Sequence, residues 1–539
     1  MDPVLSSYIF ITVKCSPTPF DPSVFNWEYY METNPDVAQG HTTEELAKSH
    51  WIYHGIYEER QAMYGFDYDE YLDMHSGENI ASDPSIPDGI EAIRHWQYFG
   101  IQEGRRGTSY AMPLRRVGIF YLGWHAHAAS AMQYLEDEDV TPQNVQDIID
   151  LRAQGQPAQI KNILYDHRDL FGPNFDLYEH AFHFHYHTKP TPGYYCIYEP
   201  KPPTPTPSFG GLPIQGCDTS IAQTHAAQLW GAGIDYVIAD ASNLSEKSPH
   251  ADVIQLRPLE ILFDEWQSYG GMTPQIAVLA LVDTTSSDAL WPLYLDLYDD
   301  HPNTVMRDPY TGNKVFFVVD NDYDNQGHDA PGAVQQAIAA NRGKNDVTVI
   351  QLWGLNSYED EGPYEWWFIS PCIKDGYWTA DIEGIGSCNQ AHTLKSPIGS
   401  QVSIAPSYQL THASQPGQST GRKGGLTFRK QFETAFTIQP DNILIWSWNE
   451  FIAQPQTKTL SIYSTGLECI GPDECDEEDG DIPDGHSAWT DTYASEYSRD
   501  IEPTYEYGDF YYRLMKSCIY YYRQQDSLPG YPECQWDQP

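Results

Sequence analysis

The sequence predicts an α/β protein: a (β/α)8 barrel of the TIM type, with a small all-α repeat module before it and an irregular C-terminal extension after it. Near-continuous apolar runs recur through the middle of the chain, amphipathic stretches separate them, and polar residues follow them. Strands buried on both faces have such runs, and their alternation with helices produces a parallel sheet. A doubly wound sheet would require a glycine-rich phosphate loop, which we do not find.

Each element of this prediction has its own segment. The expected strands are the runs at 117–124, 235–240, 275–283, 314–320, 346–354, 400–407 and 442–450, and helical patterns at 224–233 and 427–438 lie between them. The expected domains are an N-terminal segment at 1–22, two tandem helical repeats at 23–110, the barrel at 113–460 and an acidic, Tyr-rich extension at 461–539 that packs on the barrel.

The repeats extend from Phe25 to Arg60 and from Phe66 to Arg105. Each copy predicts two short helices, the second ending at a glycine. Their aromatic residues recur at helical spacing, which indicates packing between copies and, as the alternative, sugar binding. The copies resemble short repeats of large secreted bacterial and viral surface proteins, which implies an extracellular setting.

The composition limits the partners. The chain has 539 residues, with 30 Lys+Arg, 76 Asp+Glu and a net charge of −46. This charge disfavours nucleic acid and anionic membrane surfaces, and no apolar run is long enough to insert in a membrane. An aromatic content of 14% argues against disorder. A polysaccharide or glycan is the expected partner because aromatic faces stack on sugar rings. The oligomeric state is left open.

The candidate site consists of residues at the ends of the predicted strands, where barrels of this type have their active sites. Asp240, Asp320 and Glu450 are the candidate catalytic residues, because two carboxylates across a pocket can cleave a glycosidic bond. The competing interpretation is that strand-end Asp residues cap the following helices. The expected substrate contacts, some of which would belong to the core instead, are Trp124, His125, Tyr236, Trp353, Trp446, Trp448 and Asn449.

One segment carries a resemblance to a known family. The stretch GRKGGLTFRKQFETAFTIQPDNILIWSWNEF at 421–451 resembles the last barrel strand of glycoside hydrolase family 99. GIDYVIADASN at 233–243 and VGIFYLGWH at 117–125 resemble two earlier strands of the same family. The resemblance implies a barrel and endo-acting cleavage of α-mannosides. It also implies that Glu450 is the first carboxylate of an N-E-x-x-E motif, which the family uses on the sugar 2-hydroxyl.

The chain departs from this motif at Ala453, where the family has its second Glu, the general acid. Alanine cannot donate a proton, so either Asp240 or Asp320 supplies the acid or the site binds without cutting. The sequence therefore predicts a glycoside hydrolase-like protein that cleaves or binds a glycan around Glu450. The alternative is a non-catalytic carbohydrate-binding or structural cell-surface protein on a degenerate barrel.

A histidine cluster suggests a second alternative, a zinc-dependent hydrolase. His183, His185 and His187 alternate in HAFHFHYH, so on a strand they share one face. Such a set can hold zinc with a position open for water, and the competing interpretation is a hydrogen-bonded loop. The acidic run at 474–485 would take calcium if it bound a metal, and we expect a solvated loop there. The glycosidase interpretation requires no cofactor.

The nine cysteines bear on the compartment. No CxxC pair occurs, and spaced pairs such as Cys372 with Cys388 and Cys469 with Cys475 suit disulfides in an oxidising compartment. The competing interpretation is that the cysteines are free buried thiols. The start of the chain, MDPVLSSYIFITVKC, has a short apolar run without a basic segment and is a poor signal peptide. We expect an extracellular or cell-surface location.

Overall fold

The structure is a computed structural model in which the chain divides into two compact units. One unit consists of Met1–Leu114 with Pro309–Thr311, and the other of Arg115–Asp308 with Gly312–Pro539. The structure describes residues 23–40, 43–58, 60–78, 80–81, 86, 88–101, 105–109, 115–123, 125, 190–193, 195, 197, 208–209, 212–213, 220–242, 256–270, 272–282, 287–320, 346–353, 365–367, 379–382, 386–389, 392–393, 396–409, 419–451, 455–456, 488–489 and 498–523.

The first unit is all α-helical. Its elements are α1 (Trp27–Thr33), α2 (Pro35–Ala38), α3 (Glu44–His50), the π-helical turn η1 (Trp51–Gly55), α4 (Tyr68–Met74), α5 (Asp88–His95) and the π-helical turn η2 (Trp96–Gly100). Side chains cap three of the helices at the N-terminus: Asn26 before α1, Thr43 before α3 and Asp67 before α4. Each cap accepts a hydrogen bond from a backbone N–H that would otherwise have no partner in the first turn.

The same aromatic contacts occur twice in this unit. The Tyr30 hydroxyl lies 2.9 Å from His50 Nδ1, and the Tyr71 hydroxyl lies 2.8 Å from His95 Nδ1. Phe25 and Trp51 pack around Tyr30 as Phe66 and Trp96 pack around Tyr71. All six large rings are buried in one hydrophobic core, so these aromatic residues hold the unit together.

The second unit is built on a nine-stranded sheet with the order β11-β12-β15-β1-β4-β5-β6-β7-β8. Its strands are β1 (Arg116–Leu122), β4 (Tyr236–Ala241), β5 (Gln275–Val282), β6 (Lys314–Asp320), β7 (Val347–Trp353), β8 (Glu365–Trp367), β11 (His392–Thr393), β12 (Gln401–Ile404) and β15 (Asn442–Ile445). Neighbouring strands are parallel except β11, which is antiparallel to β12. Every residue of β1 and β4 is buried, as the apolar runs predict.

The sheet is curled, and its two ends approach each other. β8 lies against β11 and β12. The Trp366 indole in β8 donates a hydrogen bond of 2.9 Å to the Ser396 hydroxyl, shortly before β12. Within the described residues no backbone ladder joins β8 to β12. The architecture is therefore that of a partial TIM-like barrel.

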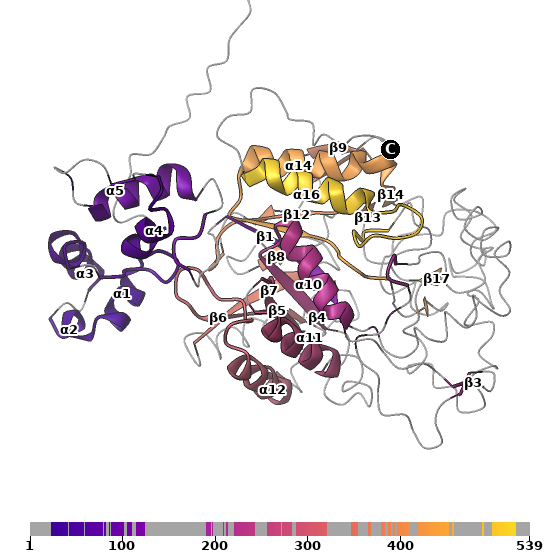
Figure 1. Cartoon of the computed structure of the whole chain (residues 1–539), viewed down its shortest axis with the longest axis horizontal. Coiled ribbons are helices and arrows are strands. Elements are labelled where there is room, and N and C mark those ends of the chain that lie inside the picture. Colours follow the sequence, from indigo (N-terminus) through magenta and orange to yellow (C-terminus); the bar gives the residue numbers. More distant parts are fainter. Residues whose placement is uncertain are drawn as a thin grey trace, which may run out of the picture. The chain divides into compact units, whose positions relative to one another are not determined.

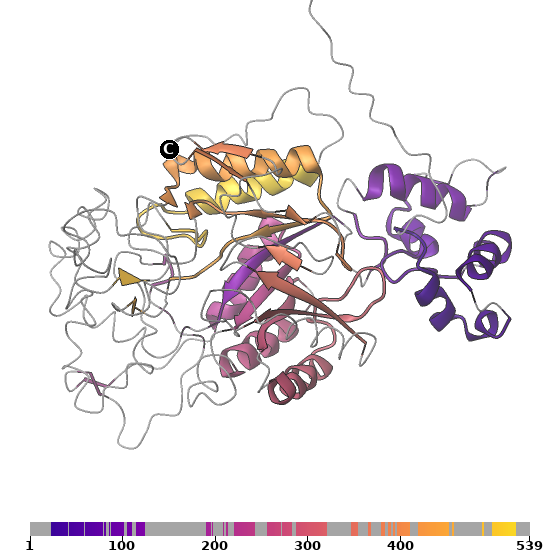
Figure 2. The same cartoon turned by 180° about the vertical axis from the view of Figure 1, so that it is seen from behind.

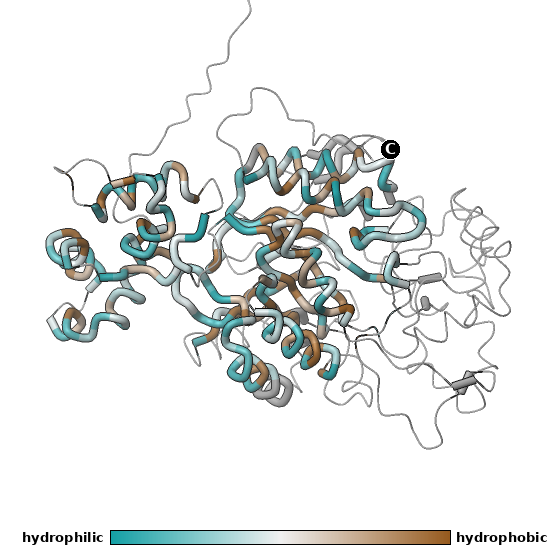
Figure 3. The backbone as a smooth tube through the Cα atoms, in the orientation of Figure 1, coloured by the Kyte–Doolittle hydropathy of each residue, from teal (hydrophilic) through white to brown (hydrophobic). Residues whose placement is uncertain are grey.

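Helices cover the outer face of the sheet (Figures 1 and 2). They are α10 (Ser220–Ala232), α11 (Arg257–Ser268), α12 (Ser287–Asp300), α14 (Leu426–Ile438) and α16 (Phe510–Arg523). α10 packs against α11 and α16, and α14 packs against α16. Hydrophobic residues are concentrated in the strands and in the helices packed on them, as the brown stretches of this unit in Figure 3 show.

Four two-stranded ladders and a 3-10 turn complete the described elements. They are β2 (Ser208–Phe209) with β3 (Leu212–Pro213), β9 (Thr379–Ile382) with β10 (Gly386–Asn389), β13 (Tyr408–Gln409) with β14 (Ser419–Thr420), β16 (Pro455–Gln456) with β17 (Ala488–Trp489), and η7 (Lys423–Gly425). No helix in the part of the chain that the structure describes is long and apolar enough to cross a membrane.

Strand alternation decides which side chains of β1 face the interior. The Tyr121 hydroxyl bonds to His225 of α10, so the odd positions of β1 face the covering helices. Arg116, Gly118 and Phe120 therefore lie on the inner face.

The strand expected at 442–450 is shorter in the structure. β15 and its pairing with β1 end at Ile445, and the chain continues to Glu450 outside the regular strand.

Candidate functional site

The segment that follows β15 is held between β1 and the residues around Arg499. The backbone hydrogen bonds are Trp446 N to Ile404 O, Trp448 N to Phe120 O, Ser447 N to Arg499 O and Glu502 N to Trp448 O, at 2.8–2.9 Å. Two segments that are about fifty residues apart in sequence are thereby joined at the carboxyl ends of β1 and β15. This is the edge of a parallel sheet where active sites usually form.

Glu450 and Arg499 form an ion pair at this edge. Arg499 Nη2 lies 3.5 Å from Glu450 Oε2, and the two side chains are 3% and 11% exposed, respectively. The guanidinium carbon of Arg499 is 5.2 Å from the ring centroid of Trp446, which is a cation–π contact. A neighbouring guanidinium favours the ionised carboxylate. Glu450 is thus suited to accept hydrogen bonds or a proton from hydroxyl groups.

Asp500 fixes the backbone on which Glu450 stands. Its carboxylate is buried and accepts hydrogen bonds from the Ser447 hydroxyl, the Glu450 N–H and the Ser498 hydroxyl. Burial raises the pKa of Asp500. Arg422 donates to the carbonyl oxygens of Ser498 at 2.8 Å and Asp500 at 2.6 Å. The segments 446–450 and 498–502 are therefore held by side-chain hydrogen bonds as well as by backbone hydrogen bonds.

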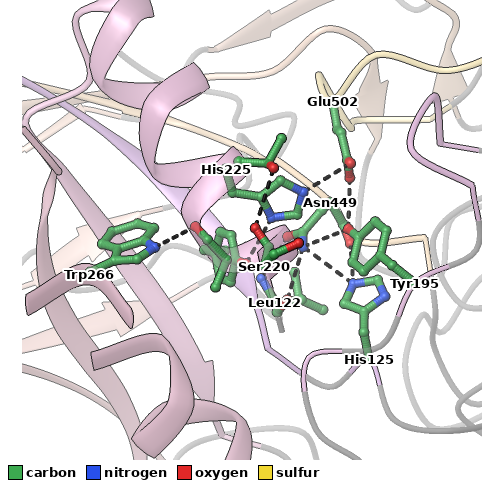
Figure 4. Close-up of polar contacts among 11 residues, drawn as sticks. Leu122, His125, Tyr195, Ser220, His225, Trp266, Asn449 and Glu502 are labelled. Atoms are coloured by element: carbon green, nitrogen blue, oxygen red, sulfur yellow. Dashed lines mark hydrogen bonds and ion pairs between the residues drawn. The ribbon is translucent and has the colours of Figure 1, made fainter. Parts of the chain in front are cut away.

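Asn449 connects the site to β1 (Figure 4). Its side-chain amide exchanges two hydrogen bonds with the backbone of Leu122, at 2.9 and 3.0 Å. His125 Nε2 lies 3.0 Å from the Asn449 carbonyl oxygen, and burial lowers the pKa of His125 to about 3. The imidazole is therefore neutral, and its Nε2 also lies 3.3 Å from the side-chain Nδ2 of Asn449.

A chain of buried polar groups continues from Asn449 to α10. Asn449 Nδ2 donates to the Tyr195 hydroxyl at 3.1 Å, and that hydroxyl donates to Glu502 at 2.7 Å. Glu502 also contacts His225 Nε2 at 3.0 Å, and the Tyr121 hydroxyl contacts His225 Nδ1 at 2.9 Å. Burial raises the pKa of both tyrosines, so both remain protonated. Figure 4 shows this chain beside Leu122 and His125.

The described residues bring part of the predicted site together. Glu450, Asn449, His125, Trp446 and Trp448 lie around the end of β1. Glu450 is 8% exposed, whereas Asn449, His125 and Trp448 are fully buried. These three side chains therefore lie beneath the site and support it. Trp446 is 4% exposed, and its ring contacts Phe120, with ring centroids 3.7 Å apart, and Arg499.

The other described candidates lie elsewhere on the sheet. Asp240 is 5% exposed near the end of β4, and its Oδ1 accepts a hydrogen bond from the Ser242 N–H at 2.9 Å, so it also caps a turn. Tyr236 begins β4 and is fully buried with its ring over Gly118. Asp320 and Trp353 are the last residues of β6 and β7.

Several predictions lie outside the described residues: Trp124, Ala453, His183, His185 and His187. Among the residues that are described, no group of three metal-ligating side chains is arranged to hold a metal ion. The zinc and calcium predictions therefore stay predictions.

The sequence did not single out the polar partners of the site. These are Tyr121, Tyr195, His225, Arg499, Asp500 and Glu502. Three of them come from the short stretch Ser-Arg-Asp-Ile-Glu at 498–502, within the segment predicted as an irregular extension. The only sign of these residues in the sequence is that three charged residues stand close together in an aromatic-rich segment. This pattern does not indicate which residues they contact.

No protein-family model matches the sequence, and no curated protein sequence matches it. Two solved structures of the GH99 endo-alpha-mannosidase from Bacteroides thetaiotaomicron are similar to the chain. The first has 13% sequence identity and a TM-score of 0.37, and the alignment covers 64% of this chain and 85% of that one. The second, in complex with bis-tris-propane, has 14% identity and a TM-score of 0.35, and covers 64% and 90%. The chain is thus distantly similar in structure to a member of the family whose motifs its sequence resembles.

Proposed function

We propose that this protein is a glycoside hydrolase-like protein that acts on a glycan at the carboxyl ends of β1 and β15. The observation that carries the proposal is the Glu450–Arg499 ion pair, a nearly buried carboxylate with a fixed counter-charge beside Trp446. Such a carboxylate can bind sugar hydroxyls. We also propose that the curled sheet closes as a full (β/α)8 barrel around this site.

Cleavage requires a second carboxylate as the proton donor to the leaving oxygen. Glu450 suits the other role, because Arg499 favours its ionised form. Asp240 is the described candidate for the acid: it lies near the end of β4, the strand that pairs with β1, and is almost buried. Asp320, at the end of β6, is the second candidate.

The second candidate function is glycan binding without cleavage. Two observations favour it: Ala453 stands where the family resemblance implies the general acid, and Arg499 already neutralises Glu450. In this case Glu450 would bind sugar hydroxyls, and no group would transfer a proton.

The experiment measures the release of reducing ends from a panel of α-linked polysaccharides. Glu450→Gln keeps the shape of the side chain and removes its charge. The matched control is Glu260→Gln, which removes an exposed carboxylate of α11 that pairs with Arg257. Asp240→Asn and Asp320→Asn then identify the acid. Turnover by the wild type that Glu450→Gln leaves unchanged would overturn the proposed role of Glu450. Absence of turnover together with binding that requires Glu450 would favour the second function.

The remaining proposals concern metal and location. We propose that the protein is extracellular or on the cell surface and contains disulfides. Its mobility in gel electrophoresis should then differ between reducing and non-reducing conditions. Stoichiometric zinc in the purified protein would favour the zinc-dependent hydrolase. Stoichiometric calcium would favour calcium binding by the acidic run at 474–485.

A further inference from the structure

Arg116 is a buried cation for which the described part of the chain provides no paired anion. It is the first residue of β1 and is fully buried. Its Nη2 donates to the carbonyl oxygen of Ile398, and its Nε and Nη1 have no hydrogen-bond partner. Among the described carboxylates none forms an ion pair with it. Burial of a guanidinium without a counter-charge is strongly unfavourable, so the folded protein requires a compensating group at this place.

Two further buried polar groups face the same region. Asn442 is the register partner of Arg116 across β1 and β15. Its Nδ2 donates at 2.9 Å to the carbonyl oxygen of Ile398 that also binds Arg116, and its Oδ1 has no partner. The guanidinium and the carboxamide are therefore neighbours on the inner face of the sheet.

Tyr236 approaches from the other side of β1. It pairs in register with Gly118, and a Cβ on Gly118 would lie 2.7 Å from the Tyr236 hydroxyl. The ring therefore crosses the inner face of β1, which Gly118 permits because it has no side chain. The hydroxyl is buried without a partner. Burial raises the pKa of Tyr236, and the charge of Arg116 opposes this rise, as expected for two groups close together.

The unpaired groups of this cluster are mainly donors. Arg116 offers the N–H groups of Nε and Nη1, and Tyr236 offers its O–H, whereas Asn442 Oδ1 is an acceptor. A cation is excluded by the guanidinium, and a neutral water would leave its charge uncompensated. We propose that a small inorganic anion of the size of chloride binds between Arg116 and Tyr236 inside the sheet. This site lies near the start of β1, away from the Glu450 site at its end.

The test uses the full-length protein and chloride as the ligand. The midpoint of thermal unfolding is measured while chloride replaces gluconate at constant ionic strength. A ligand that binds only the folded state raises this midpoint in a saturable way. Arg116→Met should abolish the chloride dependence. Tyr236→Phe should raise the half-saturating chloride concentration about tenfold, because it removes one hydrogen bond to a charged ligand.

The matched control is Tyr294→Phe. Tyr294 is also fully buried with an unpartnered hydroxyl, but it lies on α12. Its variant should keep the wild-type chloride dependence, and the comparison of the two tyrosine variants decides the matter even if Arg116→Met does not fold. An anomalous-scattering peak between Arg116 and Tyr236 in crystals grown with bromide would support the site. A midpoint independent of chloride in the wild type, or a water at that position, would overturn it.

Discussion

Two buried arginines of the second unit, Arg499 and Arg116, differ in what surrounds their charge. Arg499 lies at the carboxyl ends of the strands with Glu450 at 3.5 Å and the Trp446 ring below it. Arg116 lies at the start of β1 and donates to one carbonyl oxygen. At one end the chain itself provides the counter-charge, in the residue proposed to bind the glycan. At the other end no described carboxylate pairs with the guanidinium, and the proposed anion would provide the counter-charge.

The largest effect on stability is expected from Arg499→Met. The substitution leaves Glu450 nearly buried without its counter-charge, which should lower the free energy of unfolding by about 3 kcal/mol. Urea unfolding measures the change. The control is Arg513→Met, which breaks an exposed pair with Asp509 and should cost less than about 1 kcal/mol. Equal costs for the two variants would show that the Glu450 pair contributes no more than a surface pair.

The next largest effect is expected from Glu502→Ala. This variant leaves the Tyr195 hydroxyl and His225 Nε2 buried without an acceptor, at a cost of about 2 kcal/mol. The same urea titration measures it, and Tyr195→Phe in the Glu502→Ala background should recover part of the loss. If Glu502→Ala leaves stability unchanged, the polar chain does not support the site.

The pH dependence of stability tests the neutral state of His125. Its pKa is about 3 in the folded protein and 6.5 as the ordinary value, so the unfolded chain binds more protons between these values. The stability that His125 contributes is complete above pH 6.5 and falls as the pH drops toward 3, by up to about 1.4 kcal/mol per pH unit. His125→Phe should remove this part of the slope. An unchanged slope would mean that His125 protonates in the folded state.

The smallest loss of stability is expected from Arg116→Met in chloride-free buffer. Removing a fully buried charge for which the described residues provide no counter-charge should leave the free energy of unfolding unchanged or raise it. Urea unfolding without chloride, next to Arg499→Met, makes the comparison direct. A loss as large as that of Arg499→Met would show that Arg116 has a counter-charge in the chain.

The strands could be predicted because their chemistry is local. A strand buried on both faces is apolar at most positions, and β1, β4, β5, β6 and β7 have that pattern. β8 has only three residues, Glu365–Trp367, and gives no periodic signal. The run at 442–450 also looks like one strand, but its ladder stops at Ile445, and the next residues bond both to Ile404 and Phe120 and to the segment at 498–502.

The site could be predicted only in part for the same physical reason. Glu450 and Asn449 end an apolar run, so their position at the sheet edge follows from the sequence. Glu502 and His225 are 277 residues apart and meet through the fold alone. Hydrogen bonds of this kind leave no periodicity in the sequence. Burial and pairing of these polar groups emerge only when α10 and the C-terminal segment both pack on β1.

The central claim is that Glu450 is the carboxylate of a glycan site, and its most direct test is the release of reducing ends by wild type, Glu450→Gln and Glu260→Gln. We predict that the wild type cleaves an α-linked polysaccharide and that Glu450→Gln, assayed at a temperature at which it is still folded, lowers the rate by about 10²–10⁴-fold. Glu260→Gln should retain the wild-type rate. Equal rates for wild type and Glu450→Gln would contradict the claim.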